Sequence, residues 1–190
     1  KFVINSFIDT CEFIDIDFRE TDAVGCDTNG NLLFTTNGIM IYNRNSTVMQ
    51  GCDTLNPGHC AEQTAAVGYI LPQGALALPM LANNTEWCLF HSRLRDSHNN
   101  LGGYDVEGVY YSLIDVKQNF GLGAVTSLRN PLALNDTIDY GKLTGCRHAN
   151  GRDWWIVFFN SALTKYKRLL LSPFGVQDLG WHQFPNPSLP

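Results

Sequence analysis

Residues Leu143–Phe159 read LTGCRHANGRDWWIVFF. Two runs of β-prone residues flank Asn150-Gly151 here, and Asn-Gly between such runs is the strongest short-range signal for a hairpin with a tight primed turn. The second run, Asp153–Phe159, contains six successive apolar residues, of which four are aromatic. A strand that is apolar on both faces belongs inside a stack of sheets. We therefore expect this hairpin to form the inner part of one sheet packed between two others.

The whole chain has the composition of a globular protein that is not expected to bind nucleic acid. Its 190 residues are enough for one domain with a substantial core. The formal net charge is −5, and no basic stripe that could follow a phosphate backbone is present. No run reaches the length of a membrane-spanning helix, and no basic amphipathic helix is apparent. Nucleic acid and membrane insertion are therefore not expected.

Short β-prone runs separated by turn residues continue along the chain, and Asn37-Gly38 predicts a second hairpin. The only helical candidate is Ala61–Ala66, and Trp181–Pro190 is not expected to form a regular element. The sequence thus predicts an all-β fold. The expected strands are Glu12–Arg19, Ala23–Cys26, Leu32–Thr36, Ile39–Tyr42, Gly74–Leu81, Glu86–Ser92, Val106–Val116, Gly141–Arg147, Asp153–Phe159, Tyr166–Ser172 and Val176–Leu179.

Three of these strand pairs look like an internal repeat, each preceded by a strand of smaller residues. A small inner strand, a bulky central strand and an outer strand are typical of a propeller blade. We expect blade-like units at about residues 20–50, 70–117 and 140–180 of one propeller portion that spans residues 1–190. Because a ring needs about four to eight blades, these antiparallel units predict a partial β-propeller from a longer chain. Phe13–Phe18 would add a strand of a further blade. The repeated pairs are Leu32–Thr36 with Ile39–Tyr42, Trp87–His91 with Tyr110–Ile114, and Trp154–Phe158 with Arg168–Ser172.

Polar residues gather at the two Asn-Gly turns, and a structural role is expected for them. His148 beside Asp153 and arginines could perform acid–base chemistry, but no nucleophile elbow or paired-carboxylate pattern accompanies it. We therefore assign no catalytic residue and expect Asp153 to bind turn amides and Arg152. The aromatic run could offer a sugar-stacking platform, although core packing between blades explains most of it. The predicted hairpin residues are Asn37, Gly38, His148, Asn150, Gly151, Arg152, Asp153, Trp154 and Trp155.

Six cysteines and one oxygen-rich turn raise the question of disulfides and metals. Cys52 and Cys60 enclose a turn-rich loop, so we predict a disulfide between them, although six cysteines allow 15 pairings. Zinc at Cys52, His59 and Cys60 would lack a fourth ligand. Asp27, Asn29 and Asn31 have the alternating spacing of a calcium loop, but a plain Asn-Gly turn has the same sequence. No metal or cofactor is expected apart from this calcium candidate. Buried free thiols are the alternative for Cys26, Cys88 and Cys146; the remaining cysteine is Cys11.

Three segments resemble the amino-terminal blades of large secreted Bacteroidota proteins, in which a WD40-like propeller precedes adhesion-type modules and a type IX secretion signal. The segments are Asp27–Asn43, Leu71–Pro79 and, most specifically, His148–Trp155. The resemblance implies a propeller fold and a secreted or outer-cell-surface location, and it transfers no catalytic residue. In such bacteria, Asp-Thr-aliphatic triplets can carry O-linked glycans. Thr54 and Thr137 fit that pattern, while Asn45, Asn83 and Asn135 begin N-glycosylation sequons.

The residues and the resemblance together predict a non-catalytic scaffold for adhesion or for binding protein or glycan. The alternative is a carbohydrate-active propeller enzyme, such as a polysaccharide lyase or glycosidase, because fold alone does not separate the two. The expected partners are the remaining blades of the same polypeptide or another protein chain, with a glycan as a further candidate. An exposed apolar flank at Gly141–Leu171 would need such a cover.

Overall fold

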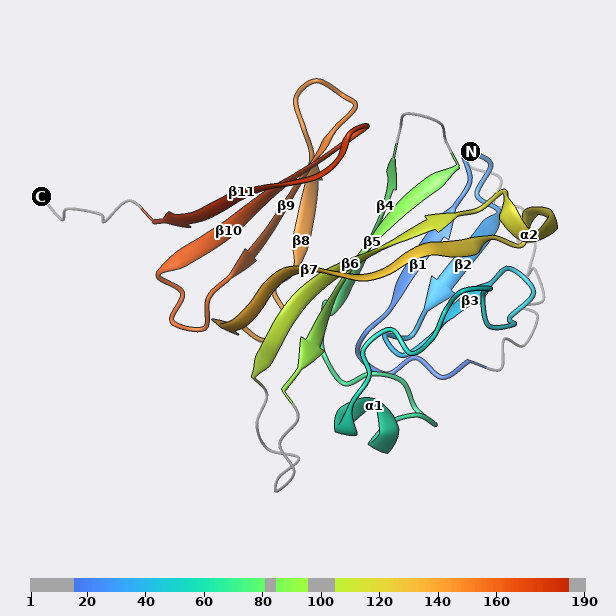
Figure 1. The fold of residues 1–190 in the computed structure, drawn as a ribbon, viewed down its shortest axis with the longest axis horizontal. Coiled ribbons are helices and arrows are strands. Elements are labelled where there is room, and N and C mark those ends of the chain that lie inside the picture. The colour runs from blue at the N-terminus through green and yellow to red at the C-terminus, as the bar shows by residue number, and fades with distance from the viewer. Residues whose placement is uncertain (1–15, 81–84, 96–104, 185–190) are drawn as a thin grey trace, which may run out of the picture.

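A computed structural model of the protein describes residues 16–80, 85–95 and 105–184. These residues form three antiparallel sheets and two short helices, as the all-β prediction requires (Figure 1). In each sheet, strands that follow one another in sequence are neighbours. Sheet A contains β1 (Ala23–Cys26), β2 (Leu32–Thr36) and β3 (Ile41–Asn43); sheet B contains β4 (Ala75–Met80), β5 (Glu86–Leu94), β6 (Val106–Asp115) and β7 (Ala124–Ile138); sheet C contains β8 (Thr144–Arg147), β9 (Trp154–Phe159), β10 (Lys165–Ser172) and β11 (Gly175–Gln183). The helices are α1 (His59–Gln63) and α2 (Gln118–Gly121).

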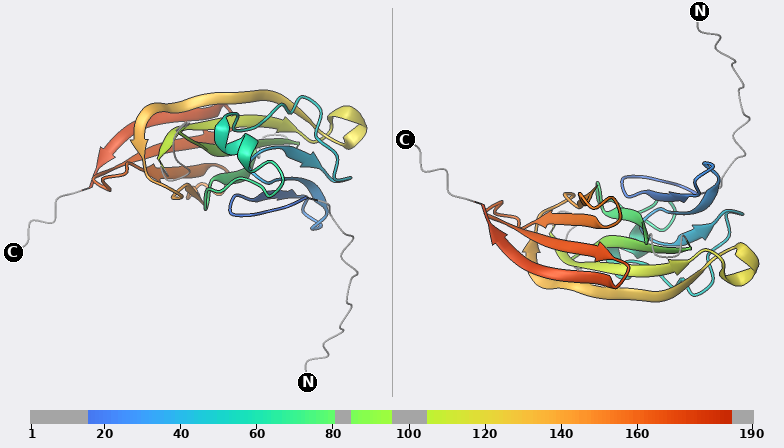
Figure 2. Two further views of the ribbon diagram at one scale, coloured as in Figure 1. Left: turned by 90° about the horizontal axis from the view of Figure 1, so that it is seen from below. Right: turned by 90° about the horizontal axis from the view of Figure 1, so that it is seen from above.

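Sheet B lies between the other two sheets (Figures 1 and 2). Its central strand β5 is buried on both faces: Trp87 and Leu89 join Phe34 of sheet A in one core cluster. Cys88 and Phe90 join a second cluster with side chains from sheet C. The strand packed between two other sheets is therefore β5. In the described part of the chain, the hairpin of residues 143–159 has a neighbouring sheet on one face only, so the predicted position between two sheets is not observed there.

Among the described residues, sheet C packs against another sheet through one face. Ile156 and Phe158 of β9, with Leu169 and Leu171 of β10, are buried against sheet B. The residues between them in β9, such as Val157, point to the other side of the sheet and are half-buried. A continuous apolar run thus indicates a strand that can pack against a sheet on each face. It does not indicate whether both neighbouring sheets belong to the described part of the chain.

The first strands of the three sheets lie next to one another. β1 runs beside β4. On the other side, β8 approaches β4 so closely that a Cβ atom added at Gly145 would lie 3.0 Å from Leu76 Cδ2. Each sheet therefore starts at the shared centre and adds its later strands outward. The described sheets do not close into a ring.

Most predicted strands are confirmed, but the outer ones were misread. β7 was missed because Pro131 and several register shifts interrupt its pattern, and an edge strand tolerates such a proline. β11 continues to Gln183, so the prediction that Trp181 onward is irregular is wrong for that part. A bulge opposite Lys167–Leu169 accommodates Gly180, whose φ is +84°. Within the predicted strand Glu12–Arg19, the described residues from Ile16 are not in a strand, and the earlier ones lie outside the described part.

Among the described residues, no helix combines the length and the apolar character needed to cross a membrane.

Candidate functional site

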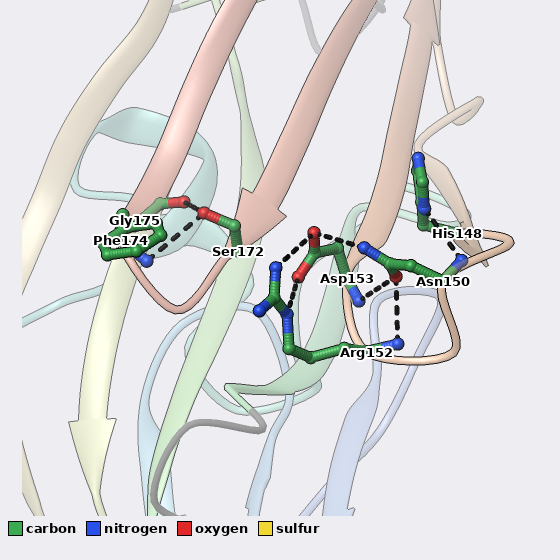
Figure 3. Close-up of polar contacts among 7 residues, drawn as sticks. All are labelled: His148, Asn150, Arg152, Asp153, Ser172, Phe174 and Gly175. Atoms are coloured by element: carbon green, nitrogen blue, oxygen red, sulfur yellow. Dashed lines mark hydrogen bonds and ion pairs between the residues drawn. The ribbon is translucent and has the colours of Figure 1, made fainter.

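The turn between β8 and β9 is built around the side chain of Asn150. Its Oδ1 accepts hydrogen bonds from the backbone N–H groups of Arg152 and Asp153, both at 3.0 Å. Gly151 has a φ of +71° and donates its N–H to the carbonyl of His148 at 2.9 Å. The connection is thus closed by the backbone N–H of His148, which donates to the carbonyl of Asp153 at 2.8 Å, together with the side-chain oxygen of Asn150 (Figure 3).

The charged residues of this turn bind each other. Arg152 Nε donates to Asp153 Oδ1 at 2.7 Å, and Asn150 Nδ2 donates to Asp153 Oδ2 at 2.7 Å. The bond from Arg152, followed by the bond from Asn150, lowers the pKa of Asp153. The hydrogen bond to Asp153 raises the pKa of Arg152. His148 Nδ1 accepts the N–H of Asn150 at 3.0 Å, and its ring lies 5.0 Å from that of Trp155. Asp153 therefore makes the contact with Arg152 that the structural interpretation predicts.

A second turn lies at the same end of sheet C, between β10 and β11 (Figure 3). Ser172 Oγ accepts the N–H of Phe174 at 3.2 Å and faces the carbonyl of Gly175 at 3.5 Å. The Phe174 side chain is 95% exposed at the tip. At this end of sheet C, the exposed ring of Phe174 thus lies beside the turn between β8 and β9, whose polar side chains bind one another.

The Asn37-Gly38 turn uses the same device. Asn37 Oδ1 accepts from the N–H groups of Ile39 and Met40, both at 3.1 Å. Gly38 has a φ of +80°, whereas neither Asn37 nor Asn150 has a positive φ. The prediction of tight primed turns is therefore wrong at both sites. The paired strands end so that four residues connect them at Asn37 and six at Asn150. In each turn the asparagine accepts hydrogen bonds through its side chain and does not adopt a left-handed backbone conformation.

A buried polar network was not predicted from the sequence. His91 in β5 is fully buried; its Nδ1 lies 2.8 Å from Asn56 Oδ1, and its Nε2 lies 3.1 Å from Ser112 Oγ. Asn56 Nδ2 donates to the carbonyl of Gly38 at 3.0 Å, so Oδ1 is the acceptor and His91 Nδ1 carries the proton. Ser112 Oγ then donates to Nε2 and accepts the N–H of Arg129 at 3.0 Å.

A hydroxyl, an imidazole and an amide in this order have the connectivity of a nucleophile, its base and an orienting group. The network is nevertheless closed, because Ser112 and His91 are 0% exposed. Burial first, and then the charge of Arg129, lower the pKa of His91 to about 3. The imidazole is thus neutral. It satisfies buried polar groups between sheet B and the segment that follows sheet A. The sequence signal was His91 within an apolar strand, but its two partners were not identifiable.

Arg129 extends this network to the molecular surface. Its guanidinium donates to the carbonyl of Thr54, and its Nη2 lies 3.6 Å from Asp53 Oδ2. Arg129 itself has a φ of +58°. An arginine of sheet B therefore binds a carbonyl and a carboxylate of the segment between sheets A and B.

The predicted disulfide between Cys52 and Cys60 is not formed in the structure, because Cys52 is a free thiol. Its Sγ accepts the N–H of Ile41 at 3.3 Å and donates to the carbonyl of Asp53 at 2.9 Å. Burial raises the pKa of this thiol. The loop is held by the core and by Arg129 rather than by a cross-link. Cys88 is buried, Cys26 and Cys146 are exposed free thiols, and Cys11 lies outside the described residues.

The calcium candidate forms a hydrogen-bonded turn. Asp27 Oδ1 accepts the N–H groups of Asn29 and Asn31 at 2.8 and 2.9 Å, and Oδ2 accepts Asn31 Nδ2 at 2.8 Å. These bonds, led by the Asn31 side chain, lower the pKa of Asp27. Both carboxylate oxygens thus already have donors, and calcium remains a prediction. In the described part of the chain, no three His, Cys, Asp or Glu side chains are grouped to hold a metal.

The candidate glycosylation residues lie in different settings. Thr54 is half-buried beside Arg129, and its own N–H donates to Asp53 Oδ1 at 2.8 Å. Thr137 lies in β7, where its side chain is outside the described part, as is that of Asn135. Asn45 is exposed in the turn after β3, and Asn83 falls outside the described residues. Modification at these positions remains a prediction.

Comparison of the chain with protein-family models, with curated proteins and with solved structures finds no match.

Proposed function

We propose that this chain is a non-catalytic portion of a β-propeller that serves as a binding or display scaffold, secreted or on the outer cell surface. The observation that carries the proposal is the common plan of the sheets. Each is an antiparallel meander, and their first strands lie side by side. A propeller repeats such meanders around a central channel.

Face-to-face packing of the sheets supports the same architecture. Sheet B contributes Trp87 to the cluster with sheet A and Phe90 to the cluster with sheet C. A blade inside a propeller has a neighbour on either face, and sheet B meets that requirement. Sheets A and C have one described neighbour each, so a ring would need further sheets on their open sides.

The scaffold role follows from how the polar clusters are used. Asp153 is bound by Arg152 and Asn150, and the His91 network is closed inside the protein. The Asp153 contacts stabilise a surface turn, and the buried His91 network has no access to a substrate. The secreted or cell-surface location rests on the sequence resemblance alone.

Sedimentation and limited proteolysis of the purified chain test the architecture. We expect concentration-dependent association and preferential cleavage in sheet C, because open apolar flanks and strand edges favour association with other chains. A protease-resistant monomer that melts in one sharp transition would contradict the partial-propeller proposal.

Assays of reducing-end release on a panel of polysaccharides test the non-catalytic part. We expect no turnover. Turnover that survives purification and is lost in a variant of the chain would favour the carbohydrate-active enzyme instead.

A further inference from the structure

We propose that the outer face of sheet C docks another β-sheet that is apolar and places one carboxylate against Arg168. This inference rests on the proposed propeller architecture and names the chemistry of the next neighbour. The outer face is defined by the half-buried side chains of β9 and β10 on the side of sheet C away from sheet B: Trp155, Val157, Phe159, Tyr166, Arg168 and Leu170.

Strand pairing shows what these positions do in sheet B. Trp87 of β5 lies opposite Ile114, and Trp154 of β9 lies opposite Leu171. Each tryptophan packs toward the preceding sheet, Trp87 with sheet A and Trp154 with sheet B. The two hairpins therefore present corresponding faces in the same direction.

The residues that follow those tryptophans face the next sheet. In sheet B, Cys88, Phe90, Tyr111 and Leu113 belong to or pack against the cluster shared with sheet C. Their counterparts in sheet C, by the same pairing, are Trp155, Val157, Arg168 and Leu170. Sheet B thus uses these positions to bind sheet C, and sheet C presents the same positions without a described neighbour. The occupant that fits them is another sheet.

Arg168 adds a chemical requirement. Its guanidinium lies 5.2 Å from the ring of Trp155, and its Nε is buried without a hydrogen-bond partner in the described part of the chain. No carboxylate of the described residues forms an ion pair with it. A docked sheet would remove the remaining water from this charge, and a buried charge left unpaired is strongly unfavourable. The docked sheet must therefore supply an anionic acceptor.

The molecule already contains such a contact. Between sheet B and the segment before β4, Arg129 binds the carbonyl of Thr54 and lies 3.6 Å from the carboxylate of Asp53. An arginine at an irregular position of β7 thus meets a carbonyl and an exposed carboxylate of the neighbouring segment. We infer the same match for Arg168.

Binding of the apolar anion anilinonaphthalene sulfonate tests this chemistry, because it combines aromatic rings with one negative charge. At concentrations where sedimentation shows a monomer, we expect the wild-type chain to bind the probe with enhanced fluorescence. Arg168→Met should weaken binding about tenfold, the effect of one charged pair of modest strength. Leu170→Asp should abolish it. The matched control is Arg147→Met, since Arg147 also stacks on a tryptophan, Trp154, at 4.9 Å; it should bind like the wild type.

The other outcomes decide against the inference in distinguishable ways. Binding that Arg168→Met leaves unchanged, while Leu170→Asp removes it, overturns the carboxylate match and leaves the propeller proposal standing, because that proposal needs only an apolar flank. Absence of binding by the folded wild-type chain overturns both. A stable dimer that Arg168→Met dissociates overturns the commitment to a further sheet, because a second copy would then occupy the face.

Discussion

At the scale of single residues, Asn56, His91 and Ser112 connect the turn-rich segment after sheet A to the middle of sheet B. Each donor in this network meets an acceptor. The network ends at the carbonyl of Gly38 on one side and at the N–H of Arg129 on the other. Removing one member would leave another buried polar group unsatisfied, which costs more than the lost bond itself. The network therefore holds the two units in one relative position.

The neutral state of His91 predicts a pH dependence of stability. Its pKa is about 3 in the folded protein, against 6.5 for the free side chain. Between these values the unfolded chain binds the proton more readily, so the free energy of unfolding falls as the pH is lowered, by up to about 1.4 kcal/mol per pH unit. Urea denaturation at about pH 7 and about pH 5 measures this slope.

His91→Gln is the control for that measurement, because it removes the titrating group. The variant should be less stable at neutral pH but should lose little further stability toward pH 5. The pKa values of Asp27 and Asp153 are lowered from 3.8, so their contributions to the free energy of unfolding are lost only below the pH range of this measurement. An equal slope in the variant would show that another group is responsible.

Gly38 and Gly151 predict different costs for the same substitution. Both have positive φ, so alanine at either position carries backbone strain of about 1–3 kcal/mol. A Cβ at Gly38 would also lie 2.6 Å from Tyr69 Cβ and 2.7 Å from Thr21 Cγ2, whereas Gly151 has nothing within 4 Å. We expect Gly38→Ala, and still more Gly38→Val, to destabilise the protein well beyond the Gly151 variants. Thermal melts compare them, and equal melting temperatures would contradict the close packing at Gly38.

At the scale of elements, the turns after β3 and β9 repeat one motif. Asn43 Nδ2 donates to Thr47 Oγ1 at 2.8 Å, and Asn160 Nδ2 donates to Thr164 Oγ1 at 3.0 Å. The residue before each threonine has a positive φ, 60° at Ser46 and 52° at Leu163. An asparagine at the strand end can therefore fix a reversal without glycine, because its amide satisfies the backbone and side-chain groups of the turn.

The two faces of β9 predict opposite sensitivities to truncation. Ile156 is fully buried against sheet B, so Ile156→Ala should lower the free energy of unfolding by about 2–5 kcal/mol. Val157 is half-buried on the outer face, and Val157→Ala should cost less than about 1 kcal/mol. Chemical denaturation of both variants measures the difference. Equal costs would mean that the outer face is already covered in the isolated chain.

At the scale of the whole molecule, the sheets share a repeated plan but have different surroundings. Sheet B has a neighbour on each face, whereas sheet C has one described neighbour and an outer face that carries Arg168. The sedimentation and probe-binding experiments test whether the outer face of sheet C is free to bind. The interface between sheets A and B contains the closed His91 network, which fixes those two sheets to each other through directional hydrogen bonds as well as apolar packing.

The sequence by itself determined most of the strands. Alternating and continuous apolar runs identified β4, β5, β6, β9 and β10, because side-chain period and β-propensity act within a few residues. The spacing of bulky strands also indicated three units, and three sheets are present. At Asn37 and Asn150 the sequence located the turns but not their geometry, since the asparagine side chain replaced the expected backbone conformation.

Only the tertiary structure decided which strand is enclosed and which polar groups meet. Trp154–Phe159 and the apolar part of β5 look equally apolar in sequence, but only β5 has a described sheet on each side. Asn56, His91 and Ser112 are 35 and 21 residues apart along the chain. Pairing of β5 with β6 brings Ser112 beside His91. Packing of the segment after sheet A on sheet B brings Asn56 within hydrogen-bonding distance of His91. Contacts between distant segments depend on how sheets are layered, and short-range sequence patterns do not encode that layering.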